Sequence, residues 1–315
     1  MKLATFLDDA GSERVGVVRQ DQVHPFAEGI SMRDVIALGL EAIQQLNTSA
    51  GIPLADVRLL PPLRPASIRD FVAFEEHVEG VRRSIDGAGG VPEAWYDAPT
   101  FYFTNPHTIV GPDEPVPFPA PSLERDFELE VAAVVGRRGR SLTAAAGADA
   151  IIGYTILNDW SARDLQRREM QVSLGPAKGK DFATTLGPWI VTADELEPFL
   201  DDDGFLRLTC TASINGVEVG RDLLSHMGWS FGTLVAYASR DSWVIPGDVL
   251  GSGTIGNGGC LAELWGRRGR QDPPPLRAGD VVTLTVEGIG SISNVVAEAD
   301  PAPELPEPRL ARVSR

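Results

Sequence analysis

Two glutamates that could bind a cation lie in a run with the pattern of a strand. Glu128 and Glu130 are two positions apart within Phe127–Val135, so their side chains would project from the same face. A half-buried strand with its glutamates in water explains this pattern too. The alternative is a pair of oxygen ligands for a divalent cation. The apolar run Ala132–Val135 favours that alternative, because it gives the strand no purely solvent-facing side.

A second polar group follows the apolar run 150–157. Asp159 would lie at the end of that strand, where binding residues are readily presented. Arg163 and Gln166 are three residues apart and would share one face of the following helix, turned either to solvent or to a ligand. Lys180 belongs to a Gly-rich loop and alone indicates nothing further.

A histidine and an aspartate share a third segment. If 68–84 is one helix, Asp70 and His77 lie on one face about 10 Å apart, a span that suits a small substrate. On the helix alone, a histidine at the margin of packing is the simpler interpretation, since an apolar stripe runs beside it through Phe71, Phe74, Val78 and Val81.

Two short motifs resemble well-known sites without their context. Gly251–Gly256 matches a dinucleotide-binding fingerprint, but Gly258 and Gly259 follow where a helix must open. The run 228–232 matches the nucleophile elbow of a serine esterase, but a poor strand precedes it. Ser230 is better explained as the N-cap of a helix.

The elements that would position these residues indicate a mainly β fold. Nine strands are expected, at 2–7, 14–19, 101–104, 127–136, 150–158, 188–192, 206–218, 247–250 and 280–286. Ser31 with Asp34, and Ser161 with Asp164, predict two capped helices. We expect a sandwich or rolled barrel with α+β elements.

The chain is expected to divide into a small part and a large part. The predicted parts are a small N-terminal α+β domain at 1–58, a Pro-rich linker at 59–67, a mainly β catalytic domain at 68–300 and a Pro-rich tail at 301–315.

Composition narrows the class of protein. The 315 residues carry a net charge of −16, which disfavours nucleic-acid and membrane-surface partners. No apolar run has the ~18 residues of a membrane helix, and the N-terminus lacks the pattern of a secretory signal, so a cytoplasmic protein is expected. Cys210 and Cys260 are too few for a disulfide framework or a thiolate zinc site.

Taken in order, these pieces resemble the catalytic C-terminal domain of the fumarylacetoacetate hydrolase family. The similarity spans about residues 60–298 and rests on Arg69-Asp70-Phe71 with His77, Glu128-Leu129-Glu130, the block 158–166, 174–176, Gly179-Lys180, Pro188-Trp189, 251–254 and Glu263.

The resemblance implies a mixed β-sandwich roll, usually dimeric, with a divalent cation. The implied ligands of Mg²⁺, Mn²⁺ or Ca²⁺ are Asp70, Glu128, Glu130 and Asp159. His77, oriented by Glu263, would activate water, and the remaining implied residues are Arg163, Gln166 and Lys180 for oxyanion stabilisation and Thr254 for substrate contact. Four carboxylates within about 5 Å would repel by several kcal/mol per pair, so they need a cation or raised pKa values.

Two positions depart from the family pattern. Val72 stands where the namesake enzyme has a substrate-contacting tyrosine, which argues against fumarylacetoacetate as the substrate. Gly80 stands where decarboxylase and acylpyruvate hydrolase relatives have a glutamate, which weakens those assignments. Pocket walls are expected from 82–107, a segment that includes Tyr102.

We therefore expect a homodimeric, metal-dependent hydrolase, with Mg²⁺ as the first choice of metal. It would cleave a carbon–carbon bond in a small anionic 1,3-diketo or acylpyruvate-like acid. Within the family, the alternative is a lyase, isomerase, decarboxylase or hydratase of a 2-oxo acid. Outside it, the alternatives are a serine esterase using Ser230 and a non-catalytic metal-binding β module.

Overall fold

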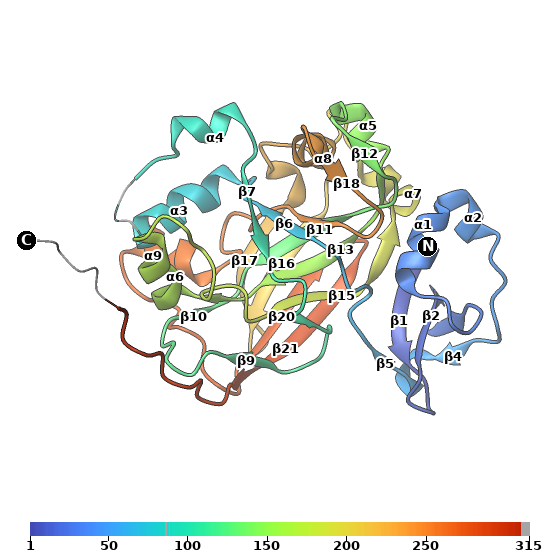
Figure 1. Ribbon diagram of the computed structural model, residues 1–315, viewed down its shortest axis with the longest axis horizontal. Helices are drawn as coiled ribbons and strands as arrows, with labels where there is room; N and C mark the ends of the chain where they lie inside the picture. The colour runs from blue at the N-terminus through green and yellow to red at the C-terminus, as the bar shows by residue number, and fades with distance from the viewer. Residues whose placement is uncertain (86, 88, 310–315) are drawn as a thin grey trace, which may run out of the picture.

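Two β-sheets with helices at their margins make up the molecule (Figure 1). The computed structural model describes residues 1–85, 87 and 89–309. Its fold confirms the predicted mainly β class with α+β elements. Positions 310–315 of the predicted tail lie outside the described residues.

The larger sheet has twelve strands, and its central members carry the candidate site. In spatial order the main path is β4 (Ile52–Pro53), β3 (Gln22–Pro25), β2 (Glu13–Arg19), β1 (Lys2–Leu7), β15 (Thr184–Thr192), β13 (Ile151–Asp159), β11 (Leu129–Val135), β19 (Val249–Gly251), β6 (Ile68–Phe71) and β7 (Phe101–Thr104). In addition, β5 (Arg58–Leu59) pairs with β1, and β8 (Ile109–Val110) pairs with β15.

The smaller sheet lies against β11 and β13. Its order is β17 (Val217–Leu223), β16 (Thr209–Ile214), β20 (Val281–Val286), β21 (Gly290–Glu298) and β9 (Val116–Phe118). Two short pairs join β10 (Arg125–Asp126) to β14 (Ser161–Ala162), and β12 (Gly139–Arg140) to β18 (Trp243–Val244). The core between the sheets includes Val131, Ile156, Ala212, Leu284 and Ile292. Burial of this apolar surface is the main force that holds the sandwich together.

Nine α-helices and three 3₁₀ turns lie within the described residues. The helices are α1 (Met32–Leu38), α2 (Leu40–Gln44), α3 (Glu75–Ile85), α4 (Glu93–Asp97), α5 (Ala144–Ala148), α6 (Arg163–Met170), α7 (Ala193–Leu196), α8 (Phe231–Ser239) and α9 (Leu261–Arg268). The turns are η1 (Leu54–Asp56), η2 (Glu197–Phe199) and η3 (Leu224–His226). In these parts of the chain, no helix is long and apolar enough to cross a membrane.

Local sequence signals were correct at two helix starts. Ser31 and Asp34 form the predicted capping box of α1. Ser230 is the N-cap of α8, and its hydroxyl accepts a hydrogen bond from the Thr233 amide at 3.4 Å. A hydroxyl used in this way supports the helix and explains the 228–232 motif without a nucleophile.

The structure contains neither a single helix over 68–84 nor a Ser161 cap, although the helix expected after Ser161 is present as α6. The segment 68–84 is not one helix: Asp70 lies in β6, and the helix begins only at Glu75. Ser161 does not cap α6, since its hydroxyl donates to the Asp159 carbonyl at 3.0 Å and the N-cap residue is Ala162. In both places strand pairing, of β6 in the large sheet and of β14 with β10, takes the residue out of the expected start of the helix.

The N-terminal strands join the large sheet directly. Lys2 and Leu3 of β1 pair with Val191 and Ile190 of β15. Side chains of β1, β2 and α1 pack against residues of β11 and β13 in one apolar cluster. The division into domains at residue 58 remains a prediction.

Candidate active site

A pocket of about 380 Å³ gathers the predicted site residues around one opening. Of the twelve predicted residues, all but Asp159 and Glu263 line it directly: Asp70, Val72, His77, Tyr102, Glu128, Glu130, Arg163, Gln166, Lys180 and Thr254. The remaining lining residues are Phe71, Val81, Thr100, Phe101, Met170 and Pro176. Residues from widely separated parts of the chain therefore meet at one site.

Neighbouring strands of the large sheet bring the four carboxylates together. Glu130 of β11 pairs with Leu157 of β13, two residues before Asp159, and Asp70 of β6 pairs with Gly251 of β19. Glu128 and Glu130 are only 5% and 1% exposed, which excludes the interpretation that they face water. Strand β11, which includes Glu130 and begins directly after Glu128, is buried along its whole length.

Gly251 leaves room for two of these carboxylates. A β-carbon at this position would lie 2.6 Å from Asp70 Oδ1 and 2.7 Å from Glu130 Oε2. Glu130 also accepts a hydrogen bond from the Gly253 amide at 3.0 Å. The absence of a side chain at residue 251 thus lets Asp70 and Glu130 approach each other in the centre of the sheet.

Burial sets the protonation of Asp70 and Glu130. Burial, and then the charge of Asp159, raise the pKa of Asp70 well above its usual range. Burial, and then the charge of Asp70, do the same to the pKa of Glu130. Both carboxyls therefore hold protons more tightly than free carboxyls do, unless a cation compensates their charge.

Lys180 lies between the other two carboxylates. Its Nζ lies 2.6 Å from Glu128 Oε2 and 2.5 Å from Asp159 Oδ2. Burial alone would raise the pKa of Glu128, but Lys180 and Arg163 outweigh it and lower the pKa. The Tyr102 hydroxyl donates to Asp159 Oδ2 at 2.5 Å, so the predicted substrate contact Tyr102 also supports a carboxylate.

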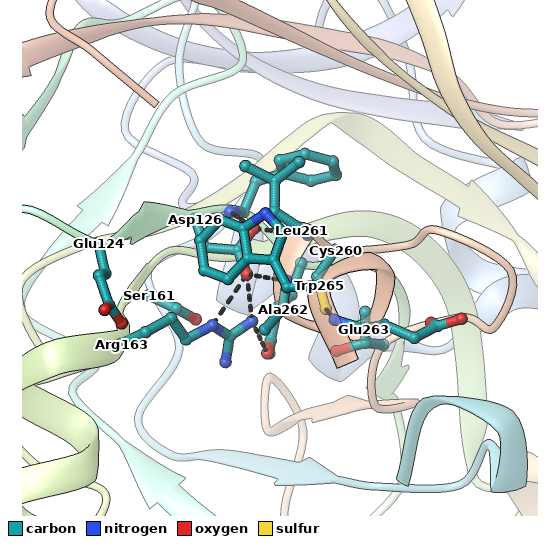
Figure 2. A network of polar contacts seen from close by, with 12 residues as sticks. Glu124, Asp126, Ser161, Arg163, Cys260, Leu261, Ala262, Glu263 and Trp265 are labelled. Atoms are coloured by element: carbon teal, nitrogen blue, oxygen red, sulfur yellow. Dashed lines mark hydrogen bonds and ion pairs between the residues drawn. The ribbon is translucent and has the colours of Figure 1, made fainter. Parts of the chain in front are cut away.

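Two carboxylates hold Arg163, and Figure 2 shows the contact with one of them, Asp126. Arg163 Nη2 lies 2.7 Å from Asp126 Oδ2 and 2.7 Å from Glu128 Oε1. Its Nη1 donates to Gln166 Oε1 at 3.1 Å, as expected for two residues on one face of α6. With its side chain only 1% exposed, Arg163 presents just the Nη1 edge of its guanidinium on the side of Gln166.

His77 and Glu263 come from two helices in close contact, α3 and α9. Glu263 Oε2 lies 3.9 Å from His77 Nδ1 and has no hydrogen-bond partner in the described structure. Cys260 Sγ lies 3.7 Å from the same nitrogen. Burial is the main cause that lowers the pKa of His77 to about 4. The charge of Glu128 opposes this shift, and the nearby cations Arg163 and Lys180 add to it. The imidazole is therefore neutral at pH 7 and able to accept a proton.

Burial also makes Glu263 a weaker acid. It raises the pKa of Glu263 to about 7, although Arg267 acts in the opposite direction. The second oxygen, Oε1, is 2.9 Å from Arg267 Nη2 and accepts from the Gly258 amide at 3.3 Å. This leaves Oε2 as the oxygen turned toward His77.

The glycine at position 80 makes this arrangement sterically feasible. A β-carbon there would lie 2.5 Å from Glu263 Cγ, so the space that a glutamate would need is already filled by Glu263. Gly266 of α9 packs on the Gly80 carbonyl in the same way.

The sequence analysis did not predict three residues that contact the site. Asp126, Cys260 and Gly251 each contact a predicted residue. Gly251 lies in a quoted motif, and Asp126 lies two residues before Glu128, so proximity in sequence was the only available signal.

The carboxylates have the chemistry of a divalent-cation site. Asp70 Oδ1 and Asp159 Oδ1 are buried and lack hydrogen-bond partners, and Asp70 and Glu130 hold raised pKa values. Oxygen ligands of this kind suit Mg²⁺, Mn²⁺ or Ca²⁺. Within residues 1–85, 87 and 89–309, no three His, Cys, Asp or Glu side chains already have metal-ligating spacing, and Lys180 lies between two of the candidates.

Comparison with known proteins gives the family. The chain matches the family described as fumarylacetoacetate (FAA) hydrolase C-terminal over residues 66–297. Protein Rv2993c of Mycobacterium tuberculosis is 35% identical over 251 residues, which cover 79% of this chain and 82% of that protein.

Solved structures agree over nearly the whole chain. A fumarylacetoacetate hydrolase from the psychrophile Exiguobacterium antarcticum gives a TM-score of 0.76 at 26% identity and covers 95% of this chain and 100% of its own. The 5-carboxymethyl-2-hydroxymuconate delta-isomerase from Mycobacterium smegmatis gives 0.70 at 28% identity, with the same coverage. The matched region contains every residue of the pocket. The chain belongs to the fumarylacetoacetate hydrolase family of enzymes, whose members include hydrolases and isomerases.

Proposed function

We propose that the protein is a divalent-metal-dependent hydrolase of a carbon–carbon bond in a 1,3-diketo or acylpyruvate-like acid. The observation that carries this proposal is the buried, neutral imidazole of His77 in the same pocket as three carboxylates and two cations, with the fourth carboxylate, Asp159, in contact with Lys180. A hydrolase needs a base for water, and a keto acid needs positive charge to bind its carboxylate.

The metal would be held by Asp70, Glu128, Glu130 and Asp159. When bound, a divalent cation would polarise the oxygens of the keto acid and offset the charge of the four carboxyls. Mg²⁺ is the first choice, because all four proposed ligands are hard carboxylate oxygens.

His77 would act as the general base. Its imidazole takes a proton from water while the water oxygen forms a bond to the carbonyl carbon. In this addition the electrons of the C=O double bond move onto its oxygen. When they re-form that double bond, the bond from the carbonyl carbon to the carbon between the two carbonyl groups breaks, its electron pair becomes the enolate of the leaving fragment, and the imidazolium gives the proton to that former central carbon. Glu263 supports the positive charge that His77 carries between these steps, as the aspartate does in serine protease triads.

Arg163, Gln166 and Lys180 would stabilise the negative charge that develops on oxygen. A well-placed donor of this kind contributes about 3–4 kcal/mol to the transition state. Thr254 lines the same pocket and would contact the bound substrate. The local cations also explain how an anionic substrate enters a chain with a net charge of −16.

The apolar part of the pocket would hold the acyl group. Phe71, Val72, Val81, Phe101 and Met170 line the pocket and form its apolar wall. We propose an acyl substituent that is itself apolar, since a second carboxylate would lose its hydration there without a partner.

A lyase, isomerase, decarboxylase or hydratase of a 2-oxo acid is the second candidate. The match to a solved isomerase at a TM-score of 0.70 favours it, because the same base could move a proton without adding water. Turnover of an acylpyruvate in ¹⁸O-labelled water separates the two. Hydrolysis places label in a new carboxylate, whereas an unlabelled product that keeps all carbon–carbon bonds would overturn the hydrolase proposal.

Candidates from other classes have weaker support. The Ser230 hydroxyl already caps α8 and lies 3.1 Å from the Thr233 hydroxyl, which leaves the serine esterase without an activated nucleophile. A non-catalytic metal-binding module would give no use to a neutral buried His77. We also propose that the protein is cytoplasmic, binds neither nucleic acid nor membranes and forms a homodimer. Light scattering after size-exclusion chromatography tests the homodimer.

A further inference from the structure

Asp126 is a fully buried carboxylate that no part of the proposed reaction uses. Its exposed fraction is 0%, and it lies at the end of β10, two residues before Glu128. Asp126 Oδ1 accepts a hydrogen bond from the Leu261 amide at 2.7 Å, and Oδ2 accepts from the Ala262 amide at 2.9 Å. These are the first two residues of α9, so Asp126 satisfies amides that the helix itself leaves unpaired.

The same carboxylate also holds Arg163 (Figure 2). Arg163 Nε donates to Asp126 Oδ2 at 2.8 Å, and Nη2 lies 2.7 Å from that oxygen. Asp126 Oδ2 therefore faces the Nε and Nη2 edge of the guanidinium and leaves Nη1 on the side of Gln166.

One side chain thus connects two parts of the proposed machinery. Residue 263, which faces His77, is the third residue of α9, and Cys260 at the N-cap of α9 lies 3.7 Å from His77 Nδ1. Displacement of Asp126 would leave Glu128 as the carboxylate that holds the guanidinium of Arg163, and it would release the first turn of α9 at the same time.

We propose that Asp126 is a positioning residue that holds Arg163 and the start of α9 in their productive arrangement. This inference rests on the proposed function, because it assigns Arg163 to the developing negative charge. Outer partners of catalytic groups affect activity by about 10–100-fold when they are changed.

A second buried aspartate supplies a matched control. Asp248 Oδ2 lies 3.1 Å from Arg69 Nη1 and accepts from the Ile245 amide at 3.1 Å. Like the first pair, Asp248 and Arg69 are almost fully buried, but neither lines the pocket. Arg69 also projects from the opposite face of β6 to Asp70.

The test is a double-mutant cycle with Asp126→Asn and Arg163→Lys, beside Asp248→Asn, in the metal-loaded full chain. The measurements are kcat and KM on the acylpyruvate that the unmodified protein cleaves, melting temperature and metal content. We expect Asp126→Asn to lower kcat by about 30–100-fold with metal retained, and to add less than about threefold in the Arg163→Lys background. Asp248→Asn should lower the melting temperature similarly yet keep kcat within about threefold.

Two outcomes overturn the proposal: equal losses of kcat in Asp126→Asn and Asp248→Asn, or losses that multiply fully in the double variant. If Asp126→Asn does not fold, Asp126→Glu keeps the charge but moves Arg163, and it should show the same loss of kcat in a folded protein whose melting temperature is somewhat lowered by overpacking. Unchanged kcat in Asp126→Glu would then overturn the proposal.

Binding of pyruvate, measured by calorimetry, separates this inference from the proposed function. If the unmodified protein cleaves no acylpyruvate, the hydrolase proposal fails, but Asp126→Asn should still weaken pyruvate binding about tenfold, and only while Arg163 is present. Equal binding in Asp126→Asn and the unmodified protein, or no binding to either, contradicts the role of Asp126.

Discussion

The backbone of Gly80 lies directly against the side chain of Glu263. A β-carbon at position 80 would be 2.5 Å from Glu263 Cγ and 3.2 Å from its α-carbon. Since position 80 is one helical turn after His77, this contact sets how closely α9 brings Glu263 to the imidazole.

Gly80→Ala should therefore damage the protein although alanine favours helices. On an exposed helix the change would stabilise by about 1 kcal/mol. Here we expect unfolding free energy to fall by about 1–3 kcal/mol from overpacking, together with a loss of kcat. Urea unfolding and turnover measure both. Glu79→Ala on the same helix is the control and should stay within about 0.5 kcal/mol. A more stable, fully active Gly80→Ala would contradict the packing described here.

The proposed base and its partner should affect turnover without affecting metal. His77→Ala removes the proton acceptor, and Glu263→Gln removes the charge that supports the imidazolium. We expect kcat to fall at least about 100-fold in each, because general base catalysis contributes about 10²–10⁴-fold. Elemental analysis should find unchanged metal content. Retained activity in His77→Ala would remove the base assignment.

The pKa values of His77 and Glu263 are shifted in opposite directions. Their effects on the pH dependence of stability should therefore nearly cancel in the unmodified protein. The pKa of His77 is lowered to about 4, so between pH 6.5 and 4 the unfolded chain binds the extra proton and stability falls as pH falls. The pKa of Glu263 is raised to about 7, so between pH 7 and 4.5 the folded chain binds the extra proton and stability rises as pH falls.

Each effect is roughly 3 kcal/mol, so the two nearly cancel in the unmodified protein. Glu263→Gln should uncover the histidine effect as a steep loss of unfolding free energy from pH 6.5 to 4.5. Urea unfolding followed by tryptophan fluorescence measures this, with His77→Ala expected to show the opposite slope. Parallel pH profiles for both variants and the unmodified protein would show that these pKa shifts are wrong.

The apolar wall predicts which keto acids are preferred. An acylpyruvate with an unbranched alkyl or aromatic acyl group should have a kcat/KM about tenfold or more above that of one ending in a second carboxylate. Val81→Lys places a cation in that wall and should reverse the order. Equal kcat/KM values for both classes, with no response to Val81→Lys, would refute the proposed orientation.

Much of the site could be predicted because its residues lie beside unmistakable strands. The apolar runs of β11 and β13 are wholly buried, and Glu130 and Asp159 lie where the patterns place them. The predicted strand 206–218 runs from β16 across the turn at Asn215 and Gly216 into the start of β17, because that turn is short. Strand β21 was not predicted because Ser291, Ser293 and Asn294 dilute its apolar alternation.

Asp70 and Asp126 show what the sequence alone could not provide. Around Asp70, the spacing of Phe71, Phe74 and Val78 matches a helix, but pairing with β19 and β7 makes the first part a strand. Asp126 finds its backbone partner Leu261 135 residues further along the chain. Such contacts follow from the packing of the whole fold, and a local pattern carries no sign of them.

Metal dependence tests the central claim most directly. The protein would be stripped with a chelator, titrated with Mg²⁺ and Mn²⁺ in a calorimeter, and assayed on acylpyruvates before and after the metal is returned. We predict one divalent ion per chain, bound with proton release because the pKa values of Asp70 and Glu130 are raised, and turnover that is lost with the metal and restored with it. Full turnover by the stripped protein, or no ion bound, would contradict the account.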